Sequence, residues 1–290
     1  MMDPDRREQP AQDGRWVRVI ITVDPGANPS APEVASDVLW SAGAAGVEEQ
    51  ASALGVSLIG GFEDADAADR AVGRARSLGL EAVAETIADD GLDAWRAWAV
   101  AEQAGRFWIT PTWVEAPEIG PEEEILWIDP GPTFGSGSHP TTRLVLELLA
   151  DLVVPGAAML DAGCGSGVLA VGAARCGANP VVATDIDPAS PEITRANAER
   201  NGVGAIVHAT TDKISEVADR GARFNVVAAN LLAPVIAEVG ADLATCLAPN
   251  GRLVISGLLA DRWEATAALL APLVVERVAE EQGWVAVVLR

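Results

Sequence analysis

Cysteine and histidine are both scarce in this chain of 290 residues. The three cysteines, Cys164, Cys176 and Cys246, are odd in number and lack any ligand spacing. They exclude a disulfide framework and a metal cluster, and they favour a reducing compartment. The two histidines, His139 and His208, lie far apart in the sequence without ligand-spaced partners, so we expect no zinc site.

Long apolar segments are missing as well. No run of about 18 apolar residues occurs, so we expect no transmembrane helix and no membrane partner. Residues 1–14 are polar and of mixed charge, with no apolar stretch behind them, and are predicted to be a disordered leader without a targeting signal. The sequence therefore predicts a soluble cytoplasmic protein.

Basic residues are the third deficit. The chain has 42 acidic and 20 basic side chains, for a net charge of −22, which argues against direct binding of nucleic acid. Residues 1–130 alone carry a net charge of −16. This acidic half could attract a basic partner, or it could serve only solubility or salt adaptation. Composition leaves both alternatives open.

The composition that is present is that of a globular protein, and 290 residues exceed one typical domain of about 100–200 residues. Residues 15–88 alternate between strand and helix patterns and predict a small βαββαβ-like α+β domain. The predicted elements are strands at Trp16–Val23, Val56–Gly60 and Glu81–Ile87, and helices at Glu33–Ala42 and Asp64–Leu78.

A connecting helix is predicted over Asp93–Ala104, within a linker of residues 89–105. Short strands follow at Arg106–Ile109 and Ile125–Ile128. From residue 131 onward strands and helices alternate, which favours a doubly wound, mostly parallel α/β sheet over residues 106–290.

The segment Met159–Gly167 (MLDAGCGSG) has a short apolar strand, an aspartate, three glycines and then a helix pattern. Gly163 and Gly165 would let the backbone approach a ligand closely at the carboxyl end of a strand. The segment also satisfies the G-x-G-x-x-A dinucleotide fingerprint, so the glycines alone leave the cofactor open. Asp161 would repel a pyrophosphate but suits a cofactor with a cationic methionine moiety. We interpret Cys164, inside this loop, as a small buried filler rather than a nucleophile.

Asp185 ends the following strand, 24 residues after Asp161, which is about the reach of an acid that binds ribose hydroxyls. We therefore expect a cofactor role for Asp185. Asp187 precedes Pro188 and is predicted to be a helix N-cap.

A second glycine-rich loop, Asp129–Thr142 (DPGPTFGSGSHPTT), leads into a helix. Gly135, Gly137 and Thr142 predict a pocket of N–H groups and hydroxyls suited to an anionic group such as a carboxylate. The alternative is an ordinary capped loop with an exposed His139. Asn230 ends a later strand, where it could orient a substrate amine or serve only as a turn asparagine.

The first glycine segment resembles that of class I S-adenosylmethionine-dependent methyltransferases. The set DPGPTFGSGSHPTT, MLDAGCGSGVLAV, ATDIDP, AERNGV, ANLLAP, SGLL and GWVAVVLR resembles the bacterial methyltransferase family that modifies the eleventh protein of the large ribosomal subunit. The resemblance implies a Rossmann-like catalytic domain, a smaller ferredoxin-like domain for substrate recognition at residues 15–88, and a helical linker between them.

This resemblance also implies S-adenosylmethionine as cofactor, a basic ribosomal protein as partner, and methyl transfer to lysine amines, with the N-terminal amine as a further candidate. By motif position, the family's cofactor contacts fall on Thr142, Gly163, Asp185 and Asn230, and Asn230 is the expected catalytic residue. The sequence departs from the family at Asn225, where an aspartate is usual, and at Pro191, which falls in the first turn of a predicted helix.

Three other functions stay open at this point. A lysine methyltransferase of the electron-transfer flavoprotein β-subunit shares the catalytic motifs. A nicotinamide-dependent dehydrogenase would use the same glycine loop. A non-catalytic binding module would keep the fold as a scaffold.

Overall fold

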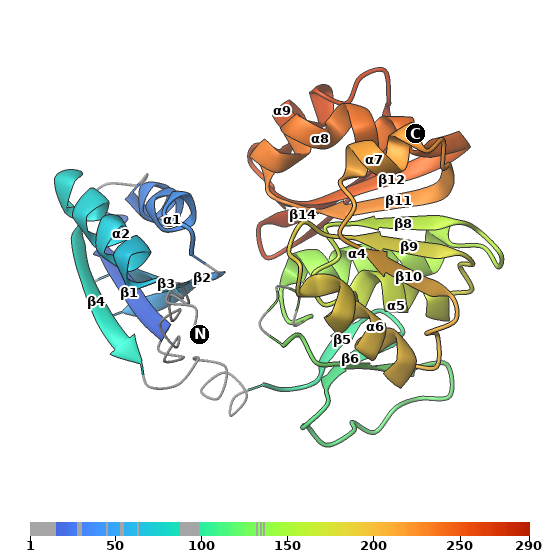
Figure 1. Ribbon diagram of the computed structural model, residues 1–290, viewed down its shortest axis with the longest axis horizontal. Helices are drawn as coiled ribbons and strands as arrows, with labels where there is room; N and C mark the ends of the chain where they lie inside the picture. Colours follow the sequence, from blue (N-terminus) through green and yellow to red (C-terminus); the bar gives the residue numbers. More distant parts are fainter. Residues whose placement is uncertain are drawn as a thin grey trace, which may run out of the picture. The chain divides into compact units, whose positions relative to one another are not determined.

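The computed structural model (Figure 1) describes residues 16–27, 31–44, 46–52, 55–62, 64–87, 99–131, 133, 135 and 137–290. The chain divides into two compact units, Met1–Trp98 and Ala99–Arg290. The predicted leader and residues 89–98 of the predicted linker lie outside the described residues.

The first unit has the predicted ferredoxin-like topology. Its strands form one antiparallel sheet in the order β2-β3-β1-β4, and both helices pack on β1. The core between them includes Ile21, Leu39 and Phe62. The elements are β1 (Trp16–Val23), α1 (Ala31–Ser41), β2 (Gly46–Ser52), β3 (Gly55–Phe62), α2 (Ala65–Ser77) and β4 (Glu81–Ile87).

The second unit is built on a seven-stranded sheet in the order β10-β9-β8-β11-β12-β14-β13. The first five strands in this order run parallel, and β14 and β13 are antiparallel to their neighbours. The strands are β8 (Met159–Ala162), β9 (Val181–Thr184), β10 (Val207–Thr210), β11 (Phe224–Asn230), β12 (Leu247–Leu259), β13 (Val275–Glu281) and β14 (Trp284–Leu289). The helices are α4 (Pro140–Leu152), α5 (Val168–Arg175), α6 (Ser190–Arg200), α7 (Ile214–Asp219), α8 (Ala233–Thr245) and α9 (Trp263–Ala268). The α/β prediction is confirmed.

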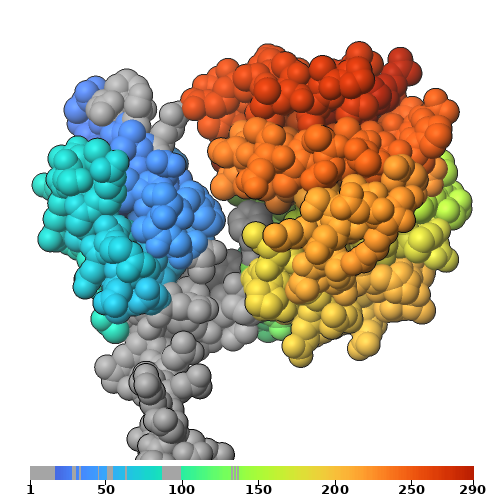
Figure 2. Space-filling view, turned by 45° about the horizontal axis from the view of Figure 1, so that its top comes forward, coloured from blue at the N-terminus to red at the C-terminus, as the bar shows by residue number. Residues whose placement is uncertain are grey.

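Helices cover both faces of this sheet (Figure 1). Successive residues of one strand therefore enter different cores: Val226 packs with α4 and α5, and Val227 packs with α7 and α8. This burial on two sides explains why the strands read as continuous apolar runs. In Figure 2 the visible surface of this unit is formed mainly by the C-terminal half of the chain.

A small three-stranded sheet extends the core on the α4–α5 side. It contains β5 (Glu102–Ala104), β6 (Phe107–Pro111) and β7 (Glu124–Ile128), in that order. The predicted connecting helix is thus wrong at its C-terminal end, because Glu102–Ala104 pairs antiparallel with β6. Gly105 makes the hairpin turn with a φ of 55°, a conformation that glycine adopts without strain.

The predicted N-cap at Asp187 is also wrong, because α6 begins at Ser190. Asp187 instead accepts a hydrogen bond from the Ala189 N–H (2.9 Å) in the preceding turn. The later start places Pro191 in the first turn, where a proline has no helical hydrogen bond to lose. The other departure is also accommodated, since Asn225 accepts a hydrogen bond from the Ala158 N–H (2.9 Å).

Transmembrane helices and clusters of metal ligands are both absent from the described part of the chain. No described helix has both the length and the apolar character needed to cross a membrane. The described residues also contain no cluster of three or more His, Cys, Asp or Glu side chains arranged to hold a metal ion.

Two helix-interior glycines test the packing of the units. A Cβ at Gly172 in α5 would lie 2.3 Å from Leu146 Cδ2, whereas a Cβ at Gly73 in α2 would meet no atom within 4 Å. We expect Gly172→Ala to lower the free energy of unfolding by about 1–3 kcal/mol through overpacking. Gly73→Ala should raise it by about 0.4–1 kcal/mol by restricting the unfolded chain. Urea unfolding measures both, and equal effects would contradict the packing described.

Candidate functional site

The loop after β8 is packed so closely that its glycines cannot be replaced freely. Gly163 and Gly167 have φ values of 77° and 78°. A Cβ at Gly163 would lie 2.4 Å from Leu231 Cδ2, and one at Gly167 would lie 2.6 Å from Thr194 Cγ2. The loop therefore lies against both the segment after β11 and helix α6, and only glycine satisfies conformation and space together.

Asp161, the penultimate residue of β8, has a fully buried carboxyl group. Its Oδ2 accepts a hydrogen bond from the Ala170 N–H in α5 (3.0 Å), and its Oδ1 has no partner among the described residues. Burial raises the pKa of Asp161 to about 7; the bond from Ala170 opposes this shift, and the nearby charge of Asp185 adds to it. A buried oxygen without a partner is costly, so this site suits a ligand that brings a donor or a positive charge.

Asp185 lies directly after β9 and connects two loops. Its Oδ2 accepts from the Gly165 N–H (2.8 Å) and its Oδ1 accepts from the Asp187 N–H (2.9 Å). These bonds orient the carboxylate and leave each oxygen a further lone pair for a ligand hydroxyl. The next side chain, Ile186, is apolar and 82% exposed.

Thr142 and Asn230 are brought together from helix α4 and the end of β11. Asn230 Nδ2 lies 3.5 Å from Thr142 Oγ1, in a long hydrogen bond between residues 88 positions apart. Thr142 is buried, and Asn230 is half-buried. The two side chains thus form one polar surface that can receive a polar group of a ligand.

The loop before α4 packs between β6 and the glycine loop. Gly135 (φ 102°) accepts a hydrogen bond through its carbonyl oxygen from Ser166 Oγ (2.6 Å). A Cβ at Gly137 (φ 89°) would lie 2.3 Å from Ile109 Cγ2. The predicted glycines at both positions are therefore required by close approach as well as by backbone conformation.

His139 is the N-cap of α4, and the alternative of a merely exposed His139 is wrong. Its Nδ1 lies 2.7 Å from Thr141 Oγ1, and its ring meets the edge of Trp284 with centroids 4.8 Å apart. The side chain is half-buried, and burial lowers its pKa, an effect that the charge of Arg143 increases.

Several structural side chains of the site were not foreseen. Ser166 and Asn197 are fully buried and bond to loop backbone, although both look like ordinary polar residues in the sequence. For Asn197, the sequence offers one indication: it lies one helical turn before Asn201 of the AERNGV segment, so the two asparagines share a helix face. Cys164 is buried with its Sγ 3.4 Å from Thr194 Oγ1, and burial raises its pKa. A buried thiol that stays protonated fits the interpretation of Cys164 as a small filler rather than a nucleophile.

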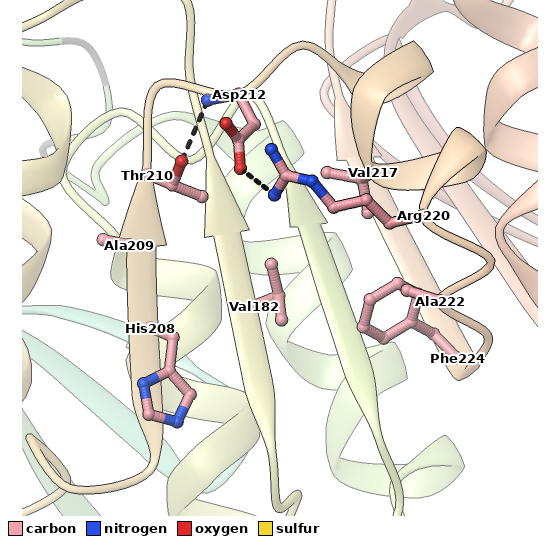
Figure 3. Close-up of a pocket in the computed structure, with 9 residues that line it drawn as sticks. All are labelled: Val182, His208, Ala209, Thr210, Asp212, Val217, Arg220, Ala222 and Phe224. Carbon is pink, nitrogen blue, oxygen red and sulfur yellow. Dashed lines mark hydrogen bonds and ion pairs between the residues drawn. The ribbon is translucent and has the colours of Figure 1, made fainter.

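A pocket of about 250 Å³ lies elsewhere, against β9, β10 and α7 (Figure 3). Asp212 and Arg220 form an ion pair of 2.5 Å near one end of it, and His208 lines it further along β10. No predicted site residue lines this pocket. His208 therefore lies away from the site built by Asp161, Asp185 and Asn230.

The strand order, the glycine loop after β8 and the acid after β9 together define the class I methyltransferase fold. The structure of a ribosomal protein L11 methylase from Lactobacillus delbrueckii subsp. bulgaricus matches with a TM-score of 0.60 and 27% identity, covering 66% of this chain and 97% of that one. The family model of ribosomal protein L11 methyltransferase (PrmA) matches residues 82–290. The chain belongs to this family.

Curated relatives agree with this assignment. The chain is 44% identical over 181 residues to the ribosomal protein L11 methyltransferase of Burkholderia ambifaria and 43% identical to that of Burkholderia multivorans. Each match covers 62% of this chain and 58% of the relative, so the chain spans less than two thirds of the length of these relatives. The family model begins at residue 82, so most of the first unit lies outside that match.

The role of Asp185 can be tested by calorimetry with S-adenosylmethionine. Hydrogen bonds to a charged group contribute about 1.5–3 kcal/mol, so Asp185→Ala should weaken binding at least tenfold while the fold is retained. Asp187→Ala is the matched control, because it removes a neighbouring carboxylate that bonds only within its own turn. Unchanged affinity in Asp185→Ala would refute the predicted ribose contact.

Asp161 predicts a particular dependence of stability on pH. Its folded-state pKa of about 7 lies above the ordinary value of 3.8, so the folded protein keeps a proton that the unfolded chain releases in this interval. The free energy of unfolding should therefore fall as pH rises from about 4 to 7. In Asp161→Asn this decrease should be smaller, as measured by urea unfolding at pH 5 and 7. The exposed Asp187→Asn serves as control, and parallel profiles for wild type and Asp161→Asn would contradict the prediction.

Proposed function

We propose that the protein transfers methyl groups from S-adenosylmethionine to lysine side-chain amines of ribosomal protein L11, with the N-terminal amine as a further acceptor. The proposal rests on one arrangement of side chains. Asn230 is hydrogen-bonded to Thr142, and in the same unit Asp185 is hydrogen-bonded to the glycine loop. Family membership supports the same reaction and the same substrate.

The residues present fit this cofactor. The unpartnered Oδ1 of Asp161 favours a cationic moiety behind the glycine loop, and Asp185 offers oriented oxygens to ribose hydroxyls. The exposed Ile186 provides an apolar surface beside Asp185 against which the adenine ring of the cofactor could pack. Gly163 is half-buried at the carboxyl end of β8, and Gly165 is held by hydrogen bonds to Asp185 and Thr194. The residues Gly135, Gly137 and Thr142 complete the cofactor site. When bound, S-adenosylmethionine supplies an electrophilic methyl group on a sulfonium.

The chain's own contribution to the reaction is alignment of the amine. A lysine amine has a reference pKa of about 10.4 and must lose a proton before it attacks. Asn230 can accept a hydrogen bond from the amine through Oδ1 while its Nδ2 is held by Thr142. This geometry would direct the nitrogen lone pair toward the methyl group, and the proton would pass to water.

The first unit is proposed to recognise the substrate. Residues 1–98 carry 18 acidic and 8 basic side chains, and this net charge of −10 complements a basic ribosomal protein. Such a reaction belongs in the cytoplasm, where ribosomal proteins are made. Direct binding of nucleic acid is not part of the proposal.

Two alternative functions differ in acceptor or cofactor. The β-subunit of the electron-transfer flavoprotein would use the same site with another acceptor, so an acceptor assay separates it from L11. A nicotinamide-dependent dehydrogenase is disfavoured by the buried Asp161 carboxyl group behind the loop, which would oppose a pyrophosphate when ionised. Calorimetry with both cofactors distinguishes these reactions.

The activity can be tested with labelled S-adenosylmethionine and the ribosomal proteins of the host. We expect label in L11, and a kcat about a hundredfold lower in Asn230→Ala because the amine loses its orientation. Asn225→Ala, which changes an exposed side chain at the opposite end of the same strand from Asn230, is the control and should retain activity. Absence of label in L11, with S-adenosylmethionine bound, would reject the substrate.

Recruitment can be tested with a chain that begins at Ala99, where the second unit starts. This start keeps strand β5 in the shortened chain. We expect the shortened chain to bind S-adenosylmethionine and to lose methylation of L11. For the whole chain, methylation should weaken as salt rises, because the screening length falls from about 10 Å at 0.1 M to about 3 Å at 1 M. Equal rates for both chains would rule out the recruiting role.

A further inference from the structure

One fully buried side chain in α6 bonds to both loops of the site. Asn197 accepts a hydrogen bond from the Asp129 N–H (3.0 Å) and donates to the Asp129 carbonyl (2.9 Å). Its Nδ2 also donates to the carbonyl of Ser166 in the glycine loop (2.9 Å). The amide thus connects the start of the segment that leads to Thr142 with the loop that follows β8.

Two further bonds strengthen this connection. Ser166 Oγ donates to the Gly135 carbonyl (2.6 Å), so the two loops also touch directly. Thr194 Oγ1, one turn before Asn197, donates to the Gly165 carbonyl (3.2 Å). Side chains of helix α6 therefore form hydrogen bonds with both loops and satisfy buried backbone carbonyls there.

We propose that Asn197 is a positioning residue that fixes Asp129, at the start of the loop that leads to Thr142, relative to the glycine loop, so that order in one loop is transmitted to the other. This inference rests on the proposed function, because Asn197 would serve that function by holding Thr142 against the cofactor loop. Asn197 itself contacts neither cofactor nor substrate. It acts through the backbone of Asp129 and Ser166.

The helix contains its own matched control. Asn201 lies one turn later and bonds in the same manner to Trp127, accepting from the N–H (2.9 Å) and donating to the carbonyl (2.8 Å). It also donates to the Asn197 carbonyl (2.8 Å) and touches neither loop. If the variants only loosened the packing between α6 and β7, substitution of either asparagine would have the same effect. If the two loops are coupled through Asn197, only its substitution would change them.

The experiment compares Asn197→Asp with Asn201→Asp in the full chain. Aspartate keeps the size and the acceptor but loses the donor to each carbonyl. Without ligand, amide exchange of residues 137–145 should become at least tenfold faster in Asn197→Asp and stay within twofold of wild type in Asn201→Asp. With ligand, kcat at saturating S-adenosylmethionine should fall at least tenfold in Asn197→Asp and stay within twofold of wild type in Asn201→Asp.

The same exchange and the same kcat in the two variants would overturn the inference. If Asn197→Asp does not fold, as judged by circular dichroism, Asn197→Ser and Asn201→Ser replace the pair, because serine removes the amide donor and keeps a small polar side chain, and the same difference in exchange is expected. Equal exchange in these two variants would then overturn the inference. Failure of the wild-type chain to bind S-adenosylmethionine would reject the proposed function instead, and the exchange comparison without ligand would still decide the coupling.

Discussion

The space around the glycine loop after β8 is the constraint on which the rest of the site depends. Leu231 and Thr194 approach Gly163 and Gly167 so closely that a Cβ at either glycine would lie at 2.4 or 2.6 Å. The segments after β11 and in α6 can therefore reach the loop backbone directly. Because β8, β9 and β11 run parallel, Asp185 and Asn230 lie at the same edge of the sheet as the loop.

Hydrogen bonds between side chains and backbone, rather than regular sheet pairing, join the three loops at this edge. Asp185 accepts from Gly165, Ser166 donates to Gly135, and Asn197 bonds to both loops. Each of these bonds is short, and Ser166 and Asn197 are fully buried. Bonds of this kind fix the described side chains of the site through the fold itself, which lowers the entropy cost of ordering them when a ligand binds.

The acidic groups of the site differ in their surroundings and therefore in their chemistry. Asp185 is partly exposed and held by two N–H donors, so it can accept hydrogen bonds from hydroxyls. Asp161 is buried with one unsatisfied oxygen, and its raised pKa follows from that burial. A sulfonium cofactor with a cationic amino group would relieve the cost of the buried carboxylate, whereas a pyrophosphate would increase it.

The sequence by itself determined the α/β architecture, the glycine loop and the acid at 185, because periodicity and strand-end position are local properties. It missed β2, where Glu48 and Glu49 are weak strand formers, and it extended a helix over β5, a strand of only three residues that pairs with β6 across a tight hairpin. The link between the two loops through Asn197 and the bond from Ser166 to Gly135 were decided only by tertiary structure. Their physical reason is the same: buried carbonyls and N–H groups needed partners, and only the folded chain shows which side chains reach them.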